Sequence, residues 1–467
     1  MPTLDGFHLP GLALEHAEFD ELRFADDVIV RVPRLDADAV RTLTDSLISA
    51  RTRTLANVPI ERIIAAVDTV ARRLADRGDA LRRTAETALP AITGYHPSMI
   101  ALVLDRMSAD WRAPALLEML RTDLGGPEAL DRFVERAPGV RSRAFGPHLV
   151  THVFAGNVPG VAVTSLVRAL LVRAASLGKT ASGEPLLAPL FARALAEEWS
   201  DLGDCIATTY WAGGSRRVED VAFEASDAVV VYGGRRAADD VRARVPAHVH
   251  LLDHGPRISF AAVGADVLPD ENSATRVIAA CARAVATFDQ QGCVSPHLVY
   301  VERGAPIPPQ DFAERLAAAL ADVEAELPRG TLTPAEAAAI HDARGAAEFR
   351  AIGGADIVVH AGPGTSYTVV YDADAAFEPS CLNRFVRVKP VPRLEDLADM
   401  LLPYRDVLQS AGVAVSETRM DAVAAALGAA GVTRVASLER LPWPPPAGHH
   451  DGRGPLAELV RWTDLEA

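Results

Sequence analysis

The segment HLVTHVFAGNVPGVAVTSLVRALLVRAASLGKTAS, residues 148–182, decides the fold class of this 467-residue chain. A short apolar run ends at Gly156, and an apolar stretch of helical length follows from Pro159. A second short apolar run then leads into a polar loop that begins at Lys179. A strand, a helix and a strand in this order predict a βαβ unit with parallel strands.

The alternation continues on the carboxyl side of this unit. Strand patterns occupy residues 204–214, 227–234, 249–255 and 257–264, and helical patterns occupy 185–199, 215–226 and 235–245. Residues 35–135 repeat apolar side chains at spacings of three and four and predict a helical layer. In sheets of this kind ligands bind outside the carboxyl ends of the strands.

A second α/β lobe is predicted from about residue 263. We expect a helix over 273–288 capped by Asn272, a strand at 297–304, a helix over 309–327, and strands at 356–361, 366–372 and 384–391. A segment rich in proline and glycine then leads to a short helix at 456–462, and no oligomerisation hairpin is evident. The predicted division is 1–262 for the helical region with the first lobe, 263–440 for the second lobe, and 441–467 for a C-terminal segment.

Charge and cysteine content exclude several classes of protein. The formal charge of −15 disfavours a nucleic-acid partner or an anionic membrane surface. The four cysteines form no Cys-x-x-Cys pair, and the first residues do not resemble a signal peptide. Residues 158–178 form the most apolar stretch, which two arginines interrupt, so no membrane span is expected. We therefore predict a cytoplasmic protein.

One cysteine stands out by its surroundings. Cys205 and Cys281 fall in apolar strand and helix patterns and are expected to pack in the core. Cys293 lies in FDQQGCVSP, residues 288–296, where small and polar neighbours favour an accessible sulfur in a loop. Cys293 is the candidate nucleophile, and Gln291 belongs to the same candidate catalytic loop. No neighbour in the sequence explains how its thiolate forms.

Three strand ends carry residues suited to binding. In FAGNVPG the backbone N–H or side-chain amide of Asn157 is a candidate oxyanion donor, although a plain turn explains the same letters. In GKTASGEP, residues 178–185, Lys179, Thr180 and Ser182 suit the ribose and phosphates of a dinucleotide. Gly233, Gly234 and Arg235 open a helix and permit close approach of a pyrophosphate, although the G-x-G-x-x-G fingerprint is absent.

Two histidines raise the question of a metal. His449 and His450 are adjacent, and no third ligand follows at a recognisable spacing. The sequence therefore predicts no metal site.

Together these motifs resemble the long-chain acyl-CoA reductase family, the LuxC-type branch of the aldehyde dehydrogenase superfamily. The resemblance rests, in the family's order, on FAGNVPG, GKTASGEP, DAVVVYGG, DHGPRISF, FDQQGCVSP, GVTRV and HHDG, which span residues 147–460. It implies an aldehyde dehydrogenase-like α/β fold with two Rossmann-type lobes, an N-terminal helical region and an active site between the lobes. It also implies a homo-oligomer and the reduction of an acyl-CoA or another activated acyl group to an aldehyde with NADPH.

Residue roles follow from the same resemblance. Cys293 resembles the acyl-accepting nucleophile, and Asn157 resembles the oxyanion donor that acts with the backbone N–H of Cys293. Lys179 resembles the lysine that holds the adenosine ribose. Ser182 falls near a glutamate of NAD-preferring relatives, so a small hydroxyl there leaves room for a 2′-phosphate. Gly233 and Gly234 resemble the turn under the pyrophosphate.

One departure from the superfamily pattern bears on the reaction. Hydrolytic aldehyde dehydrogenases carry a water-activating glutamate where this chain has Asp253 and His254. The shorter Asp253 suits an acyl-cysteine that receives hydride instead of water, and His254 is an alternative proton donor. Either Glu378 or residues 383–385 approach the nicotinamide side.

Three functions remain open at this point. The first is thioester reduction, in which an acyl-donating or aldehyde-consuming enzyme is a possible partner. The second is aldehyde oxidation with Asp253 as the base. The third is a non-redox acyl-transfer or scaffold protein.

Overall fold

The computed structural model describes residues 3–466, which form two compact units. Among the described residues, the first unit contains 3–93, 100–255 and 445–466, and the second contains 94–99 and 256–444. The division thus falls between Gly255 and Pro256, and the last residues of the chain return to the first unit. Within residues 3–466 no helix combines the length and apolar character that a membrane crossing requires.

The first unit is built on a five-stranded parallel sheet with the order β10-β9-β6-β7-β8. The strands are β6 (Leu149–Val153), β7 (Ala175–Thr180), β8 (Ile206–Tyr210), β9 (Ala228–Tyr232) and β10 (His250–His254). The chain adds β7 and β8 on one side of β6, and then adds β9 and β10 on the other. This reversal creates a topological switch point between β6 and β9, where ligands bind in open α/β sheets.

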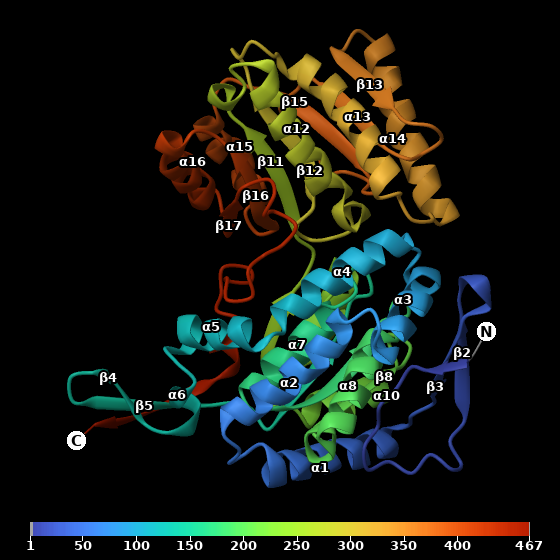
Figure 1. The fold of residues 1–467 in the computed structure, drawn as a ribbon, viewed down its shortest axis with the longest axis vertical. Helices are drawn as coiled ribbons and strands as arrows, with labels where there is room; N and C mark the ends of the chain where they lie inside the picture. The colour runs from blue at the N-terminus through green and yellow to red at the C-terminus, as the bar shows by residue number, and fades with distance from the viewer. Residues whose placement is uncertain (1–2, 467) are drawn as a thin grey trace. The chain divides into compact units, whose positions relative to one another are not determined.

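Helices cover both faces of this sheet because its strands are apolar on both sides. Apolar residues of β6, β7 and β8 pack against α1 (Ala37–Thr54) and α10 (Arg216–Glu224). The opposite face lies under α7 (Val161–Leu171) and α8 (Leu187–Glu198), as Figure 1 shows. The remaining helices of the unit are α2 (Ile60–Ala75), α3 (Ala80–Thr93), α4 (Pro97–Asp110), α5 (Ala113–Leu124), α6 (Glu128–Asp131), α9 (Ser200–Gly203) and α11 (Arg235–Arg242).

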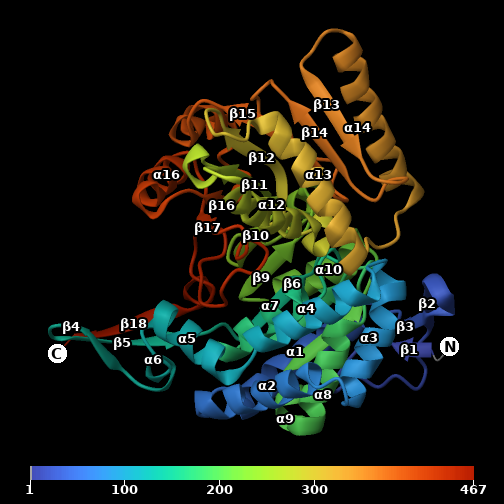
Figure 2. The same cartoon turned by 45° about the horizontal axis from the view of Figure 1, so that its top comes forward.

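Two small sheets flank the first unit, and neither was predicted. β1 (Thr3–Asp5), β2 (Phe19–Arg23) and β3 (Ile29–Pro33) form one of them, in the order β1-β3-β2. The other joins β18 (Arg461–Glu466) to the hairpin of β4 (Val134–Ala137) and β5 (Val140–Phe145). Figure 2 shows β18 beside β5. The helix expected at 456–462 is reduced to a 3-10 turn at Ala457–Leu459, because antiparallel pairing with β5 draws the backbone from Arg461 onward into a strand.

The second unit contains a seven-stranded sheet with the order β13-β14-β15-β12-β11-β16-β17. Its strands are β11 (Ile258–Val263), β12 (Pro296–Glu302), β13 (Ile357–Ala361), β14 (Thr368–Asp372), β15 (Phe385–Val391), β16 (Leu408–Ala414) and β17 (Arg434–Ala436). All pairs are parallel except the one between β13 and β14.

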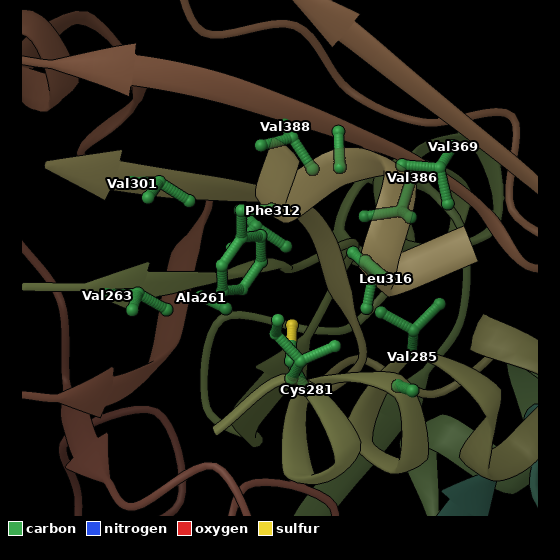
Figure 3. Packing of buried hydrophobic residues seen from close by; sticks show 14 of the residues in the cluster. Ala261, Val263, Cys281, Val285, Val301, Phe312, Leu316, Val369, Val386 and Val388 are labelled. Atoms are coloured by element: carbon green, nitrogen blue, oxygen red, sulfur yellow. The ribbon is translucent and has the colours of Figure 1, made fainter. Parts of the chain in front are cut away.

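Alternate side chains of the central strands enter two different cores. Ala261 and Val263 face α12 (Glu271–Ala286) and α13 (Pro309–Glu326), where Cys281 lies fully buried among them (Figure 3). Phe260 and Ala262 face α15 (Leu397–Leu401) and α16 (Glu417–Ala429). α14 (Pro334–Ile352), which was not predicted, packs on β13 and β14. The expected cap of α12 was also wrong, because Asp270 accepts the Ser273 N–H at 2.8 Å in the role assigned to Asn272.

A buried histidine makes the first unit sensitive to acid. His152 in β6 hydrogen bonds to Ser165 Oγ at 2.8 Å and to Ser176 Oγ at 3.2 Å. Burial lowers the pKa of His152 to about 3. The unfolded chain takes up this proton near pH 6.5, so falling pH below that value favours unfolding by about 1.4 kcal/mol per pH unit until about pH 3.

We therefore predict that lowering the pH reduces the free energy of unfolding of the parent more than that of the variant His152→Gln. At neutral pH the variant has the lower free energy of urea unfolding because it loses buried packing. This deficit shrinks by roughly 2 kcal/mol between about pH 6.5 and pH 5. His248→Gln, at an exposed position, is the control and shows no such trend. A deficit for His152→Gln that stays constant with pH contradicts the assignment.

Candidate active site

The carboxyl edge of the first sheet gathers most of the candidate binding residues. Because its strands are parallel, the loops after β6, β7, β9 and β10 meet at this edge. Asn157 is exposed in the turn after β6, and Gly233 and Gly234 follow β9. β6 and β9 are the two strands that border the switch point, so these turns line the position where the fold class binds ligands.

The loop after β7 presents a lysine from within the sheet. Lys179 is the penultimate residue of β7 and is 8% exposed. Burial lowers the pKa of Lys179, and the negative charge of Glu219 partly offsets this effect. Thr180 is buried at the end of the strand, whereas Ser182 is exposed in the loop.

The acidic residue of this loop, Glu184, is bonded to the start of α8. Glu184 is buried, and its Oε1 accepts the backbone N–H groups of Leu186 and Leu187 at 2.9 and 2.7 Å. It therefore satisfies donors at the start of α8. α8 begins at Leu187, two residues later than the helix predicted over 185–199. The exposed part of the loop offers a hydroxyl and backbone groups.

The glycines after β9 leave the start of α11 uncovered. Gly233 and Gly234 are absent from the positive-φ positions, so the backbone conformation does not require glycine there. An added Cβ at Gly234 would meet no heavy atom of the described residues within 4 Å. Arg235, the first residue of α11, is exposed. Open backbone N–H groups beside an arginine suit a phosphate group.

Asp253 and His254 at the end of β10 point to opposite sides of the strand. Asp253 forms an ion pair with Arg242 of α11. His254 Nδ1 lies 2.8 Å from Asp451 Oδ2, and the two side chains are 11% and 6% exposed. The two candidates therefore have different environments, and the charged partner of Asp253 is a cation whereas that of His254 is a carboxylate.

Asp451, the partner of His254, lies in a tight turn. His450 and Arg453 exchange backbone hydrogen bonds at 2.8 and 3.0 Å, and Asp451 and Gly452 between them have φ of 53° and 79°. An Asp-Gly pair with positive φ at both positions is typical of a type I′ turn. The His450 ring stacks on His254 with centroids 4.0 Å apart and an interplanar angle of 9°.

The second unit contains the candidate nucleophile at the amino edge of its sheet. Cys293 is exposed just before β12, whereas Gly292 and Val294 on either side are buried. Its backbone carbonyl accepts the Ser259 hydroxyl at 2.7 Å. Cys205 and Cys281 are buried, and burial raises the pKa of each thiol to about 12. These two thiols pack as predicted.

Two strained turns and a buried ion pair fix the loop that carries Cys293. Residues 288–290 all have positive φ, between 48° and 66°, and residues 382–384 also have positive φ, between 57° and 68°. The guanidinium of Arg384 donates to Asp289 Oδ1 at 2.7 and 3.0 Å, and both side chains are buried. Left-handed backbone at such residues persists only where its surroundings enforce it.

Glutamines complete the link between the two turns. Gln290 Nε2 donates to the carbonyls of Pro296 and Phe385 at 2.8 and 2.9 Å. Gln291 Nε2 donates to Asn383 Oδ1 at 2.9 Å. Residues 383–385 therefore contact the Cys293 loop, whereas Glu378 pairs with Arg387 at 2.5 Å.

An arginine supplies positive charge near the cysteine. The guanidinium of Arg434 in β17 donates to the carbonyls of Leu441 and Arg440 at 2.8 and 2.6 Å, and these bonds fix its position. Burial lowers the pKa of Arg434 to about 10, and negative charge on Cys293 acts in the opposite direction. The strand pairing also places Arg434 near this loop. Ser410 pairs with Arg434 and donates its N–H to the Ser259 hydroxyl, and the same hydroxyl donates to the Cys293 carbonyl.

Comparison with known proteins places the chain in a family. The model of the family described as acyl-CoA reductase (LuxC) matches residues 55–462. The chain belongs to this family of reductases. A long-chain acyl-protein thioester reductase of Vibrio harveyi is 24% identical over 426 residues, covering 88% of this chain and 84% of the relative. The protein with the same description from Aliivibrio fischeri is 26% identical over 442 residues, covering 88% and 83%.

Solved structures confirm the predicted fold class. A lactaldehyde dehydrogenase matches with a TM-score of 0.75 and 15% identity, covering 100% of this chain and 99% of that one. Aldehyde dehydrogenase 21 from Physcomitrella patens matches with a TM-score of 0.74 and 13% identity, covering 100% and 98%. The fold of this LuxC-family member is thus that of the aldehyde dehydrogenases.

Four residues that shape these sites, Asp289, Arg384, Arg434 and Asp451, lie in stretches that the sequence analysis singled out, but the contacts they make were not predicted. The Asp-Gly pair at 451–452 was a readable turn signal. The contacts of the other three carried no local signal, because each involves a partner far away in the chain.

We predict that Arg384→Met lowers the free energy of unfolding by roughly 3–5 kcal/mol, since it leaves the Asp289 carboxylate buried without its cation. Urea unfolding measures the change. Arg393→Met is the control, because the Arg393 side chain is 67% exposed and its ion pair with Glu395 contributes little, about 0–1 kcal/mol. Equal effects of the two substitutions contradict the assigned role of the buried pair.

Proposed function

We propose that this enzyme reduces an acyl thioester to an aldehyde through an acyl group carried on Cys293, with NADPH as reductant. The observation that carries the proposal is an exposed cysteine on a rigidly held loop, in a chain of the LuxC family. Arg434 favours the thiolate form of Cys293, because the attraction between their opposite charges is mutual. A thiolate is the form that attacks a thioester carbonyl.

Donors for the developing oxyanion are assigned to two backbone turns. Attack by the thiolate makes a tetrahedral intermediate whose negative oxygen needs preorganised hydrogen bonds. We assign these to Asn157 and to the backbone N–H of Cys293. Gln291 holds the loop through Asn383, so its contribution is to position Cys293.

The carboxyl edge of the first sheet fits a dinucleotide. Lys179 and Thr180 would hold the ribose, and Gly233, Gly234 and Arg235 would hold the pyrophosphate. When bound, NADPH supplies the hydride. Ser182 favours the 2′-phosphate of NADPH, because the carboxylate of this loop, Glu184, is occupied by α8.

We propose acyl-CoA as the substrate, in keeping with the description of the family. An acyl-protein thioester, which the named relatives reduce, is the alternative acyl donor. An acyl-donating or aldehyde-consuming enzyme would then be the partner, in the cytoplasm. We further propose a homo-oligomer, for which the exposed strand β18 offers an edge.

The second candidate function, aldehyde oxidation, needs a base that activates water. The candidate base, Asp253, is paired with Arg242, which engages one of its two carboxylate oxygens. Thioester reduction needs no such base, so this contact favours reduction.

We predict that Cys293→Ala abolishes both the covalent acyl adduct and the reduction of acyl-CoA. Intact mass after mixing with a panel of acyl-CoA esters, without NADPH, detects the adduct and identifies the acyl group. Cys381→Ala, at a partly exposed cysteine of the same unit, is the matched control and keeps the adduct. Turnover by Cys293→Ala at the parent rate would refute the proposed nucleophile.

We predict that Ser182→Glu shifts cofactor preference from NADPH towards NADH by roughly tenfold or more, because a carboxylate there repels the 2′-phosphate. Calorimetric binding of each dinucleotide, without substrate, measures the ratio. Ser182→Gln has the same length without the charge and retains the parent preference. An unchanged ratio in Ser182→Glu means that this loop does not contact the 2′-phosphate.

A further inference from the structure

Two polar side chains lie side by side at the ends of β7 and β8. Lys179 of β7 pairs in register with Thr209 of β8. Both side chains face α10, because Leu177 and Ala207, two residues earlier on the same strands, share a core with that helix. Thr209 is fully buried, and its hydroxyl has no hydrogen-bond partner among the described residues. Lys179 is 8% exposed, and its ammonium makes no hydrogen bond or ion pair with the part of the chain that the structure describes.

The nearby carboxylate, Glu219 of α10, does not supply the missing partner. Its Oε1 accepts the Trp211 indole N–H at 3.3 Å, and its Oε2 accepts Arg244 Nη1 at 2.5 Å. Glu219 therefore acts on Lys179 through its charge alone. A largely buried ammonium without a hydrogen-bonded partner is costly, so we expect a ligand to provide that partner.

The first turn of α10 adds positive charge beside this lysine. The hydrogen bond between Trp211 and Glu219 holds the turn at the end of β8. Arg216 and Arg217 are exposed there, and neither forms an ion pair within residues 3–466. The side chain of Ser215 does not cap the helix. Open N–H groups next to two arginines suit a phosphate group that carries two negative charges.

A ribose that bears a phosphate matches this combination of groups. An ammonium can bond to the ribose hydroxyls while the start of α10 binds the phosphate on the same sugar. NADPH and CoA both contain adenosine 5′-diphosphate with one further phosphate on the ribose, at O2′ in NADPH and at O3′ in CoA. These two oxygens are adjacent on the sugar, and the exposed arginine side chains are long enough to reach a phosphate on either one.

We propose that Lys179 and the first turn of α10 bind the phosphorylated ribose of an adenosine nucleotide, and that NADPH and CoA compete for this subsite. This inference rests on the proposed function and adds that the nucleotide parts of its two substrates bind one at a time. The residues involved all belong to the first unit. CoA then leaves before NADPH enters, an order that a covalent acyl-cysteine permits because the acyl group stays on the enzyme.

Calorimetry on the full chain with three adenosine nucleotides isolates the contribution of the ribose phosphate. The probes are AMP, adenosine 2′,5′-bisphosphate and adenosine 3′,5′-bisphosphate, which differ only in that phosphate. Each bisphosphate is expected to bind roughly tenfold more tightly than AMP. Replacing both arginines, Arg216→Gln with Arg217→Gln, is expected to weaken each bisphosphate roughly tenfold and AMP by less than about twofold.

Two further variants complete the series. Lys179→Met is expected to weaken all three nucleotides, because each of them contains the ribose. Arg53→Gln is the matched control, since Arg53 is exposed at the opposite end of β8, near Cys205, and it leaves all three affinities unchanged. Equal weakening of AMP and the bisphosphates in the double variant would show that the phosphate does not bind at α10.

Competition is measured by titrating CoA into the protein at increasing concentrations of NADPH, without an acyl group. The apparent Kd of CoA is expected to rise in proportion to the NADPH concentration. A Kd that stays constant shows two separate sites and overturns the shared subsite. Weakening of the 2′,5′-bisphosphate alone in the double variant also overturns it, because the subsite would then serve NADPH only.

The results that overturn this proposal differ from those that overturn the proposed function. Independent binding of CoA and NADPH refutes the shared subsite and leaves the acyl adduct on Cys293 unaffected. Reduction of acyl-CoA by Cys293→Ala refutes the proposed function and leaves the competition between the two nucleotides unaffected.

Discussion

The buried ion pair between Asp289 and Arg384 is the constraint on which the second unit's site depends. It joins two chain segments that each hold three consecutive residues at positive φ. Each such residue costs of order 1–3 kcal/mol, so neither turn would persist alone. Arg384 also donates to Glu324 of α13 at 2.6 Å, and the Gly330 N–H donates to Asp289 Oδ2 at 3.0 Å. The turns are therefore anchored to the sheet and to a helix.

That anchoring explains how an exposed cysteine can be held in one place. A loop on the surface is normally mobile, because few contacts order its backbone. Here the residues before Cys293 are buried and bonded, and its carbonyl is held by Ser259, while the side chain alone faces outward. A nucleophile with a fixed backbone can also present its own N–H as a hydrogen-bond donor, which a mobile loop cannot do reliably.

The sequence predicted the α/β alternation because strand and helix periods are local signals. It also predicted an exposed loop for Cys293 and strand-end positions for Asn157 and Lys179, which the structure confirms, whereas their functional roles stay predictions. The prediction of a helix was wrong at β18, because pairing with a hairpin far away in the chain overrides a helical pattern in the sequence. It missed α14 although Thr333 and Glu336 form a capping box, because the helix is Ala-rich and its apolar face is weak. The contacts of Arg434 and Arg384 were not predicted, because their partners lie far away in the chain.

The end of β10 places Asp253 and His254 beside partners of opposite charge. Adjacent residues on a strand face opposite ways, so one position serves Arg242 and the next serves Asp451. Asp253 is the candidate base for water, and its ion pair with Arg242 engages one oxygen of the carboxylate that hydrolysis of an acyl-cysteine would use. The proposed thioester reduction needs no such base, so the arrangement at this strand end agrees with the proposed function.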